Sequence, residues 1–163
     1  MGIADPRVLI NQSFADPGVQ LQPAGVDLTV GEVMVFEEEG ELDFTNQRRR
    51  LPEHRSLPWE REKLRLTPGA YLVRYREEVT IPPDAMGIIL PRSSLMRMGA
   101  VLYSAVWDPG YRGRGVGLLA VFHPLTLHRG ARIGQLILIR LAFDPKQLYR
   151  GSYQGEGGVP EQV

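Results

Sequence analysis

The chain has 163 residues, and its 19 basic and 19 acidic side chains leave no formal net charge at pH 7. This length fits one domain with a substantial core, and the balanced charge argues against binding nucleic acid or anionic membranes, which usually requires net positive charge. Cysteine is absent, which excludes disulfides and thiolate metal sites. Because there is no long apolar run and no signal-peptide pattern, a cytoplasmic location is expected.

The first predicted elements are a short helix within residues 5–12 and a half-buried strand around Val26, Leu28 and Val30, which alternate with polar residues. Asp27 lies inside this strand pattern, where a carboxylate needs a partner. Two roles are open for it. It holds an arginine in place, or it helps to bind Mg²⁺ through water.

Residues 37–65 differ in character, with an acidic run at residues 37–39 and a basic run at residues 48–50. The pattern favours a solvated, charged excursion. A nucleic-acid role for the arginines is the weaker interpretation, because acidic residues flank them.

From residue 66 onward, short apolar stretches recur with Gly and Pro turns between them, and no long helical period appears. This predicts an all-β fold, a sandwich or barrel of antiparallel strands. Residues 1–148 are expected to form the single domain. Residues 149–163 are expected to be a glycine-rich tail that is either disordered or a lid ordering on a ligand.

A polar segment with two arginines and two serines follows an apolar run ending at residue 90: Arg92, Ser93, Ser94 and Arg97. The arginine fork and the serine hydroxyl suit phosphate oxygens. The alternative is a helix start capped by Ser93 or Ser94. The two interpretations are compatible, because a helix N-terminus is itself a site for anions.

One strand later, Asp108 precedes a Pro-Gly turn. It is either a turn former or a carboxylate that orients and deprotonates water. Tyr111, three residues on, could pack on a sugar ring or be an ordinary half-buried tyrosine. Gln135 interrupts an apolar strand, where it could reach a phosphate, a base or a neighbouring backbone group. The three histidines show no metal-ligand spacing, and no zinc-deaminase signature is present.

Four segments, in order, resemble motifs of the dUTPase and dCTP deaminase superfamily: residues 22–28, 92–99, 108–113 and 130–136. The tail at residues 149–155 is similar to the C-terminus of the deaminase-like branch. Each motif alone is weakly specific, but four in order are strongly so. The resemblance runs from about residue 20 to the end of the chain.

The resemblance implies a distorted, jelly-roll-like β-barrel, a homotrimer with sites shared between subunits, and a deoxynucleoside triphosphate ligand with Mg²⁺. It also implies roles for single residues. Arg92 and Ser93 would contact phosphates, Asp108 would activate the water that attacks the α-phosphorus of dUTP, and Tyr111 would stack on deoxyribose. Gln135 would belong to the fourth motif, and Gln154 to the tail.

Deaminases of this family use a glutamate on the strand after the Asp-Pro-Gly loop, and the corresponding position here is Leu118. Leucine cannot transfer a proton, so hydrolysis of dUTP to dUMP and diphosphate is the expected activity. The alternatives are a dCTP deaminase or a bifunctional enzyme, which needs an acid from elsewhere, and a nucleotide-binding regulator without turnover. The tail lacks the phenylalanine that stacks on uracil in dUTPases, so Tyr153 is the candidate substitute. Trp107 stands where a smaller aliphatic residue is usual.

Overall fold

Strands dominate the fold, as the sequence predicts, and the computed structural model describes residues 2–158. The strands are β1 (Leu21–Gln22), β2 (Gly25–Phe36), β3 (His54–Ser56), β4 (Lys63–Leu66), β5 (Gly69–Tyr75), β6 (Val79–Thr80), β7 (Ala85–Pro91), β8 (Ala100–Tyr103), β9 (Arg112–Gly113), β10 (Val116–Val121), β11 (Leu125–His128) and β12 (Arg132–Arg140). The helices are the short 3₁₀ segment η1 (Pro6–Leu9) and two α-helical turns, α1 (Pro17–Gln20) and α2 (Ser93–Arg97).

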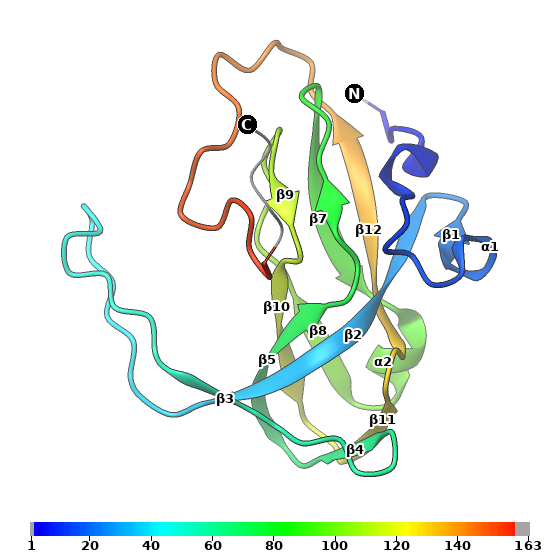
Figure 1. Cartoon of the computed structure of the whole chain (residues 1–163), viewed down its shortest axis with the longest axis vertical. Helices are drawn as coiled ribbons and strands as arrows, with labels where there is room; N and C mark the ends of the chain where they lie inside the picture. Colours follow the sequence, from blue (N-terminus) through cyan, green and yellow to red (C-terminus); the bar gives the residue numbers. More distant parts are fainter. Residues whose placement is uncertain (1, 159–163) are drawn as a thin grey trace.

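The main sheet has the order β7-β12-β2-β5-β10-β8 and curls into a barrel (Figure 1). Its long strand, β2, belongs to both halves. The first part of β2 pairs with β12, and from Val30 onward β2 pairs with β5. The predicted all-β barrel is therefore confirmed, and β2 is the strand that connects its two halves.

The barrel closes between β7 and the segment that follows β8. Gly87 and Trp107 exchange two backbone hydrogen bonds, each of 2.8 Å. β8 itself ends at Tyr103, and Trp107 pairs with β7 as an isolated bridge. This closure places the Asp108 loop at the seam of the barrel.

The core fills the barrel with the inward-facing residues of each strand, including Val26, Leu28 and Val30 of β2, and Leu136 and Leu138 of β12. The alternation predicted for residues 26–30 is correct for the apolar positions. The polar positions between them, Asp27 and Thr29, are also buried because the N-terminal segment covers the outer face of β2.

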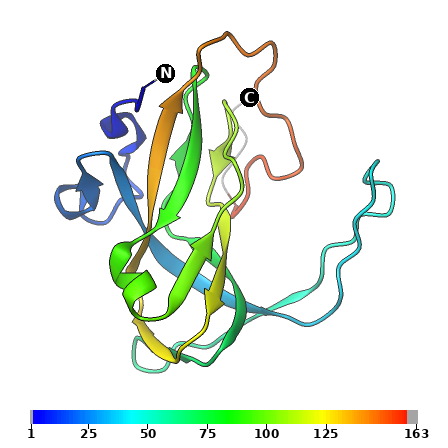
Figure 2. The same cartoon turned by 180° about the vertical axis from the view of Figure 1, so that it is seen from behind.

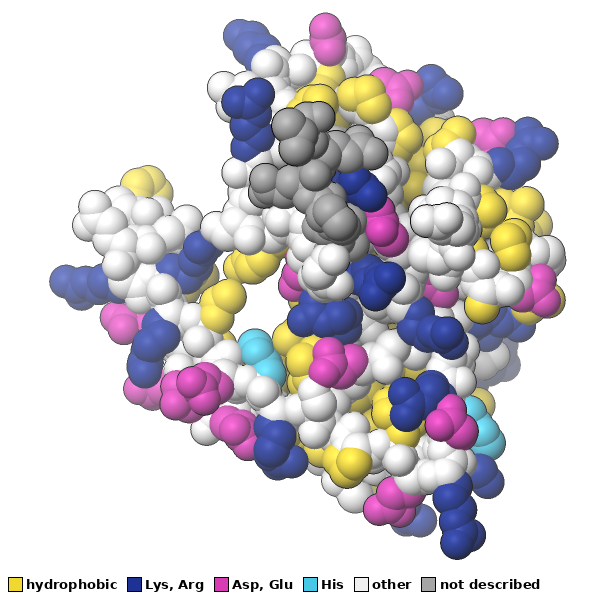
Figure 3. All heavy atoms as spheres, viewed as in Figure 1, with side chains coloured by type: hydrophobic (Ala, Val, Ile, Leu, Met, Phe, Trp, Pro, Cys, Tyr) yellow, Lys and Arg dark blue, Asp and Glu magenta, His cyan; other side chains and the backbone are white. Residues whose placement is uncertain are grey.

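The charged excursion forms an arm that projects from the barrel between β2 and β3 (Figures 1 and 2). A backbone bridge between Glu41 and Arg50 holds its two sides together. Charged side chains line the arm (Figure 3), and the Phe44 side chain on the arm is fully exposed. The predicted solvated excursion over residues 37–65 is confirmed for the arm up to residue 53, whereas β3 and the start of β4, with the buried Leu64, belong to the strands of the fold.

Within residues 2–158, no helix is long and apolar enough to cross a membrane. The cytoplasmic location remains a prediction from the sequence.

Candidate functional site

The segment rich in arginine and serine forms the first part of the candidate site. Arg92 lies at the end of β7, and its Nε is 3.1 Å from Oδ2 of Asp27. Arg132, at the start of β12, donates from Nη1 to the same oxygen at 3.0 Å. Asp27, Arg92 and Arg132 are called the arginine cluster below. Because strands β7, β12 and β2 are neighbours in the sheet, the cluster spans three strands at one end of the barrel.

Asp27 holds the two guanidiniums in place. Its side chain is only 2% exposed, whereas each arginine side chain is 30% exposed. Burial raises the pKa of Asp27, and the charges of Arg92 and Arg132 oppose that rise. Of the two roles left open by the sequence, the structure shows the one in which Asp27 holds arginines in place. It leaves two partly exposed cations fixed side by side, as a binder of phosphate oxygens requires.

The serines do not cap α2. The N-cap of α2 is Arg92, which makes no side-chain capping bond, and Ser93 is the first helical residue. The expected capping role for Ser93 or Ser94 is therefore wrong. Both serines are exposed, and Arg97 lies exposed in the last turn of the helix. Their side chains thus face solvent beside the arginine cluster.

Asp108 is exposed and borders a pocket of about 160 Å³. Four aromatic or acidic side chains line this Asp108 pocket together with Trp107: Tyr111, Tyr149, Tyr153 and Glu156. The volume suits a single small ring rather than a whole nucleotide. A carboxylate thus stands at the mouth of a small, largely aromatic pocket.

The back of the pocket is an aromatic wall made possible by glycines. Trp107 contacts Tyr111 edge to face, with ring centroids 5.1 Å apart. A Cβ at Gly115 would lie 2.7 Å from Trp107, and one at Gly113 would lie 2.7 Å from the Tyr111 hydroxyl. Only glycine leaves room for these rings. Gly115, directly before β10, thereby leaves space for the ring of the unusual Trp107.

Tyr111 is more buried than a sugar-stacking residue needs to be. Its side chain is 6% exposed, and burial, together with the nearby Glu156 carboxylate, raises its pKa. Its ring nevertheless forms part of the pocket wall. The stacking role on deoxyribose remains a prediction.

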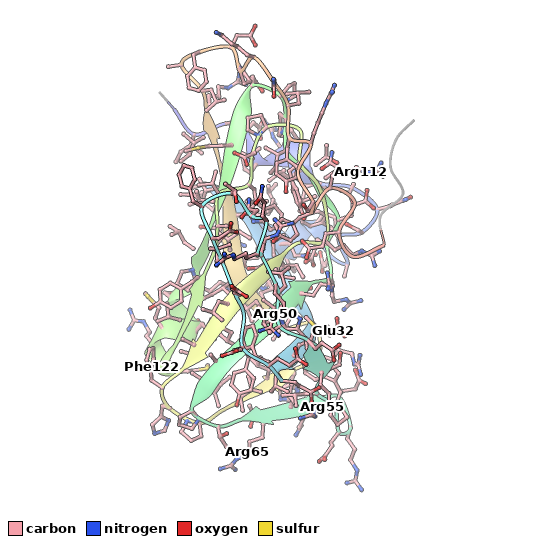
Figure 4. The ribbon with its side chains drawn as sticks, turned by 90° about the vertical axis from the view of Figure 1, so that its left-hand side faces the viewer. Glu32, Arg50, Arg55, Arg65, Arg112 and Phe122 are labelled. Carbon is pink, nitrogen blue, oxygen red and sulfur yellow. The ribbon has the colours of Figure 1, made fainter. Side chains whose placement is uncertain are left out.

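The tail folds back over the Asp108 loop. The Tyr149 amide donates to Pro109 O at 2.8 Å, and the Gly155 amide donates to Arg112 O at 2.9 Å. The Gln154 side chain accepts from the Arg112 amide at 3.0 Å and donates to Gly110 O at 3.1 Å. Figure 4 shows Arg112 in the upper part of the molecule, beside this segment. Predicted site residues Tyr153 and Gln154 therefore do meet the Asp108 loop, whereas residues 159–163 lie outside the described part of the chain.

Glu156 is the site residue that sequence reasoning missed. It pairs with Gly113 as an isolated bridge, and its Oε1 lies 3.7 Å from Nη1 of Arg74. Burial raises its pKa, with Arg74 opposing the shift. No sequence pattern marks it, because its position depends on how the tail folds back. It brings a second carboxylate to the pocket of Asp108.

The structure does not bring the arginine cluster and the Asp108 pocket together within one chain. Gly87 lies opposite Trp107, so Asp108 lies near Met86, while Arg92, directly after the end of β7, is six residues further along the chain. At about 3.3 Å per strand residue, this separation is roughly 20 Å. Accordingly, α2 lies on the far side of the barrel from the tail (Figures 1 and 2).

Leu118 lies on the outer face of β10, opposite Leu72 of β5 and Tyr103 of β8. The next row of this face consists of Ala70, Ala120 and Val101. Leu118 is 38% exposed, and Val116 on the same strand borders the Asp108 pocket. An apolar sheet face therefore begins at the edge of the pocket.

Gln135 is half-buried on β12, between Asp27 of β2 and Leu90 of β7. It belongs to the neighbourhood of the arginine cluster, not to that of Asp108. Within residues 2–158, no three His, Cys, Asp or Glu side chains are grouped so as to hold a metal ion.

Comparisons with known proteins agree with this architecture. The family model described as dCTP deaminase-like matches residues 3–141. A protein of Methanocaldococcus jannaschii named deoxyuridine 5'-triphosphate nucleotidohydrolase is 42% identical over 138 residues, covering 83% of this chain and 88% of the relative. A probable enzyme of the same name from Aeropyrum pernix is 46% identical over 139 residues, covering 84% and 86%.

Solved structures support the fold. The 2'-deoxycytidine 5'-triphosphate deaminase of Agrobacterium tumefaciens superposes with a TM-score of 0.59 at 21% identity, covering 84% of this chain and 48% of that one. A variant of the dUTPase of Staphylococcus bacteriophage 80alpha, with dUpNHpp, gives a TM-score of 0.51 at 16% identity, covering 91% of each chain.

Proposed function

The chain belongs to the dCTP deaminase-like family, and we propose that within it the protein is a dUTP diphosphatase, which converts dUTP and water to dUMP and diphosphate. Relatives at 42% and 46% identity carry the name of this activity. The observation that supports it most directly is the exposed Asp108 at the mouth of the aromatic pocket. Leu118, on the outer face nearby, offers no group for proton transfer.

In the proposed reaction, Asp108 accepts a proton from a water molecule, which attacks the α-phosphorus of dUTP. The bond from the α-phosphorus to the oxygen that bridges to the β-phosphorus breaks, and diphosphate leaves. Such phosphoryl transfers depend mostly on positioning and on stabilising charge. We assign the positioning of the phosphates to Arg92 and Ser93, with Ser94, Arg97 and Gln135 beside them. The ring pocket of Tyr111 and Tyr153 would take one ring of the nucleoside.

A second copy of the chain is needed to complete this site. The arginine cluster and Asp108 are roughly 20 Å apart in one chain by strand geometry, too far for both to contact one triphosphate. The apolar outer face around Leu118 and Tyr103 adjoins the pocket and suits a subunit contact. We therefore propose a homotrimer in which each site combines Asp108 of one copy with the arginine cluster of another.

We propose that Mg²⁺ enters bound to the triphosphate. Mg²⁺ commonly binds through substrate phosphates, waters and one or two carboxylates, and this agrees with the lack of a preformed cluster of acids or histidines within residues 2–158. When bound, it neutralises charge on the phosphate oxygens. The indirect contact predicted for Asp27 remains a prediction. Asp27 Oδ2 is the oxygen that both arginines engage.

The test is to incubate the purified protein with dUTP or dCTP and Mg²⁺, and to assay diphosphate and ammonia separately. Diphosphate from dUTP, with no ammonia from dCTP, is expected. Tight binding of dUTP without any product would instead support the nucleotide-binding regulator.

A second candidate function, deamination of dCTP alone or with hydrolysis, is favoured by one observation. Glu156 is a carboxylate of raised pKa in the same pocket as Asp108, and a proton shuttle needs such a group. Ammonia release from dCTP that disappears in Glu156→Gln would establish this activity.

A further inference from the structure

Glu77 is a buried carboxylate that the proposed reaction does not use. It follows β5, and its side chain is 1% exposed. The groups that bond to it are neutral: Gln20 Nε2 donates to Oε1 at 2.8 Å, Thr29 Oγ1 donates to Oε1 at 2.7 Å, and the Thr29 amide donates to Oε2 at 2.9 Å. Burying a carboxylate costs free energy of solvation. The several short hydrogen bonds to Glu77 offset part of this cost.

These bonds hold the backbone of β2 on both sides of Leu28. Gln20 Nε2 donates not only to Glu77 but also to Asp27 O, at 3.0 Å. The peptide unit after Asp27 is therefore held by Gln20, and the peptide unit before Thr29 is held by Glu77. Gln20 is fixed in turn, because its Oε1 accepts from the Asp16 amide at 3.0 Å.

At this place the ladder between β2 and β5 has not yet begun, because it starts at Val30. Here β2 leaves β12 and begins to pair with β5, and the ladders with both strands contain irregularities at this point. The Thr29 amide would be an unsatisfied buried donor without Glu77, which costs free energy. Glu77 thus replaces a ladder bond at the point where the strand changes partner.

The same stretch of β2 carries the arginine cluster. Asp27 and Thr29 are two residues apart, so their side chains share one face of the strand. Asp27 holds both Arg92 and Arg132, and Arg132 lies opposite Thr29 in the sheet. Arg132 Nη1 also donates to Val19 O, next to Gln20. The buried carboxylate is therefore connected to the two guanidiniums through hydrogen bonds to the backbone of β2 and through the Asp27 side chain.

We propose that Glu77 is a positioning residue for nucleotide binding. By fixing the backbone on both sides of Leu28, it sets the direction of the Asp27 carboxylate and hence of Arg92 and Arg132. This inference rests on the proposed function, in which the arginine cluster binds the phosphates.

The test compares Glu77→Gln with the unmodified protein by calorimetric titration with the nonhydrolysable analogue dUpNHpp and with dUMP, both with Mg²⁺. An amide NH₂ in place of Oε2 would oppose the Thr29 amide with a second donor. Loss of a charged hydrogen bond predicts an affinity for dUpNHpp lower by about tenfold. The affinity for dUMP, which lacks two of the phosphates, should fall by about threefold or less.

Asp84→Asn is the matched control, because Asp84 is an exposed carboxylate that pairs with Arg140 far from the cluster. It should bind both ligands as the unmodified protein does. Thr29→Val is the second variant. It removes the hydroxyl donor but keeps the amide bond and the shape of the side chain, and it should lower the affinity for dUpNHpp by about threefold. If Glu77→Gln fails to fold, Thr29→Val decides the question.

Unchanged affinity for dUpNHpp in a folded Glu77→Gln, or in Thr29→Val where Glu77→Gln does not fold, would overturn the proposal. An equal loss for dUpNHpp and dUMP would also overturn it, because Glu77 would then serve only the general stability of the fold. Binding of the analogue does not require turnover. Failure of the proposed function would show separately, as no diphosphate released from dUTP by the unmodified protein.

Discussion

At the residue scale, the main result is that two aspartates of the motifs, Asp27 and Asp108, lie in opposite environments. Asp27 is buried against two arginines, whereas Asp108 is exposed beside the pocket. The sequence left two roles open for each. The structure shows Asp27 holding two arginines and leaves Asp108 exposed to solvent, and acceptance of a proton from water by Asp108 remains a prediction.

Asp108→Asn should reduce turnover of dUTP by about a hundredfold or more, because general-base catalysis contributes at least this much. The affinity for dUpNHpp should stay within about twofold, since the amide keeps the shape of the side chain. Steady-state kinetics and calorimetric titration measure the two effects. An equal loss of binding would assign Asp108 a structural role.

Gly115 is the residue that makes room for Trp107. In Gly115→Ala the new Cβ would lie 2.7 and 2.9 Å from two atoms of the indole ring, which Tyr111 and Tyr75 hold from other sides. Overpacking of this kind costs about 1–3 kcal/mol of unfolding free energy, measurable by urea denaturation.

Gly18→Ala, where the new Cβ would make only an ordinary contact, is the control and should be close to neutral. Adding Trp107→Leu to Gly115→Ala should recover part of the loss. Full additivity of the two changes would argue against the clash.

At the element scale, the tail packs along the Asp108 loop and β9 through backbone hydrogen bonds. Backbone bonds connect it to residues 109–114, and the Gln154 side chain replaces two further backbone partners of that loop. The sequence allowed a disordered tail or a lid that orders on a ligand, and the structure shows residues 149–158 docked against the Asp108 loop. The sequence could not decide this, because a glycine-rich polar segment orders only where a partner backbone is available.

Glu156 should make docking of the tail depend on pH. Burial raises its pKa above the ordinary value of 4.5, so the docked tail binds the proton more tightly than the free tail does. Docking is then favoured below pH 4.5 and weakens as the pH rises through the raised pKa. Glu156→Gln should remove this dependence and protect the amides of the tail better at neutral pH.

Hydrogen exchange of residues 149–158, corrected for the intrinsic rate at each pH, measures this effect. Glu62→Gln serves as the control, because Glu62 is an exposed carboxylate that pairs with Arg129 beside β4 and β11, at the end of the barrel away from the tail (Figure 1). Equal protection of the tail at all pH values in the unmodified protein would contradict the expectation.

At the scale of the whole molecule, the barrel separates the two parts of the site instead of joining them. The arginine cluster lies at one end of β7, and the Asp108 loop joins the same strand near its other end. In the proposed homotrimer, each active site is completed between two copies, and the apolar face around Leu118 is the surface proposed for their contact.

Mixing Arg92→Ala with Asp108→Asn tests this arrangement. Each variant alone should be nearly inactive. After unfolding and refolding together, random exchange of subunits should restore about a quarter of the sites, each with Asp108 from one copy and Arg92 from another. Size-exclusion chromatography with light scattering checks that the mixture is still trimeric. A mixture as inactive as its components would place both residues in one site of a single chain.

The sequence by itself determined the local features: alternating strands, glycine turns, a charged arm and a set of ordered motifs. These depend on the side-chain period of a strand and on the conformational freedom of single residues, which act over a few positions. Only the tertiary structure decided that Asp27 binds two arginines, that Arg92 instead of a serine begins α2, and that Glu156 reaches the pocket. Each of these depends on contacts between residues distant in the chain, where burial, and not sequence spacing, sets the free energy of a charged group.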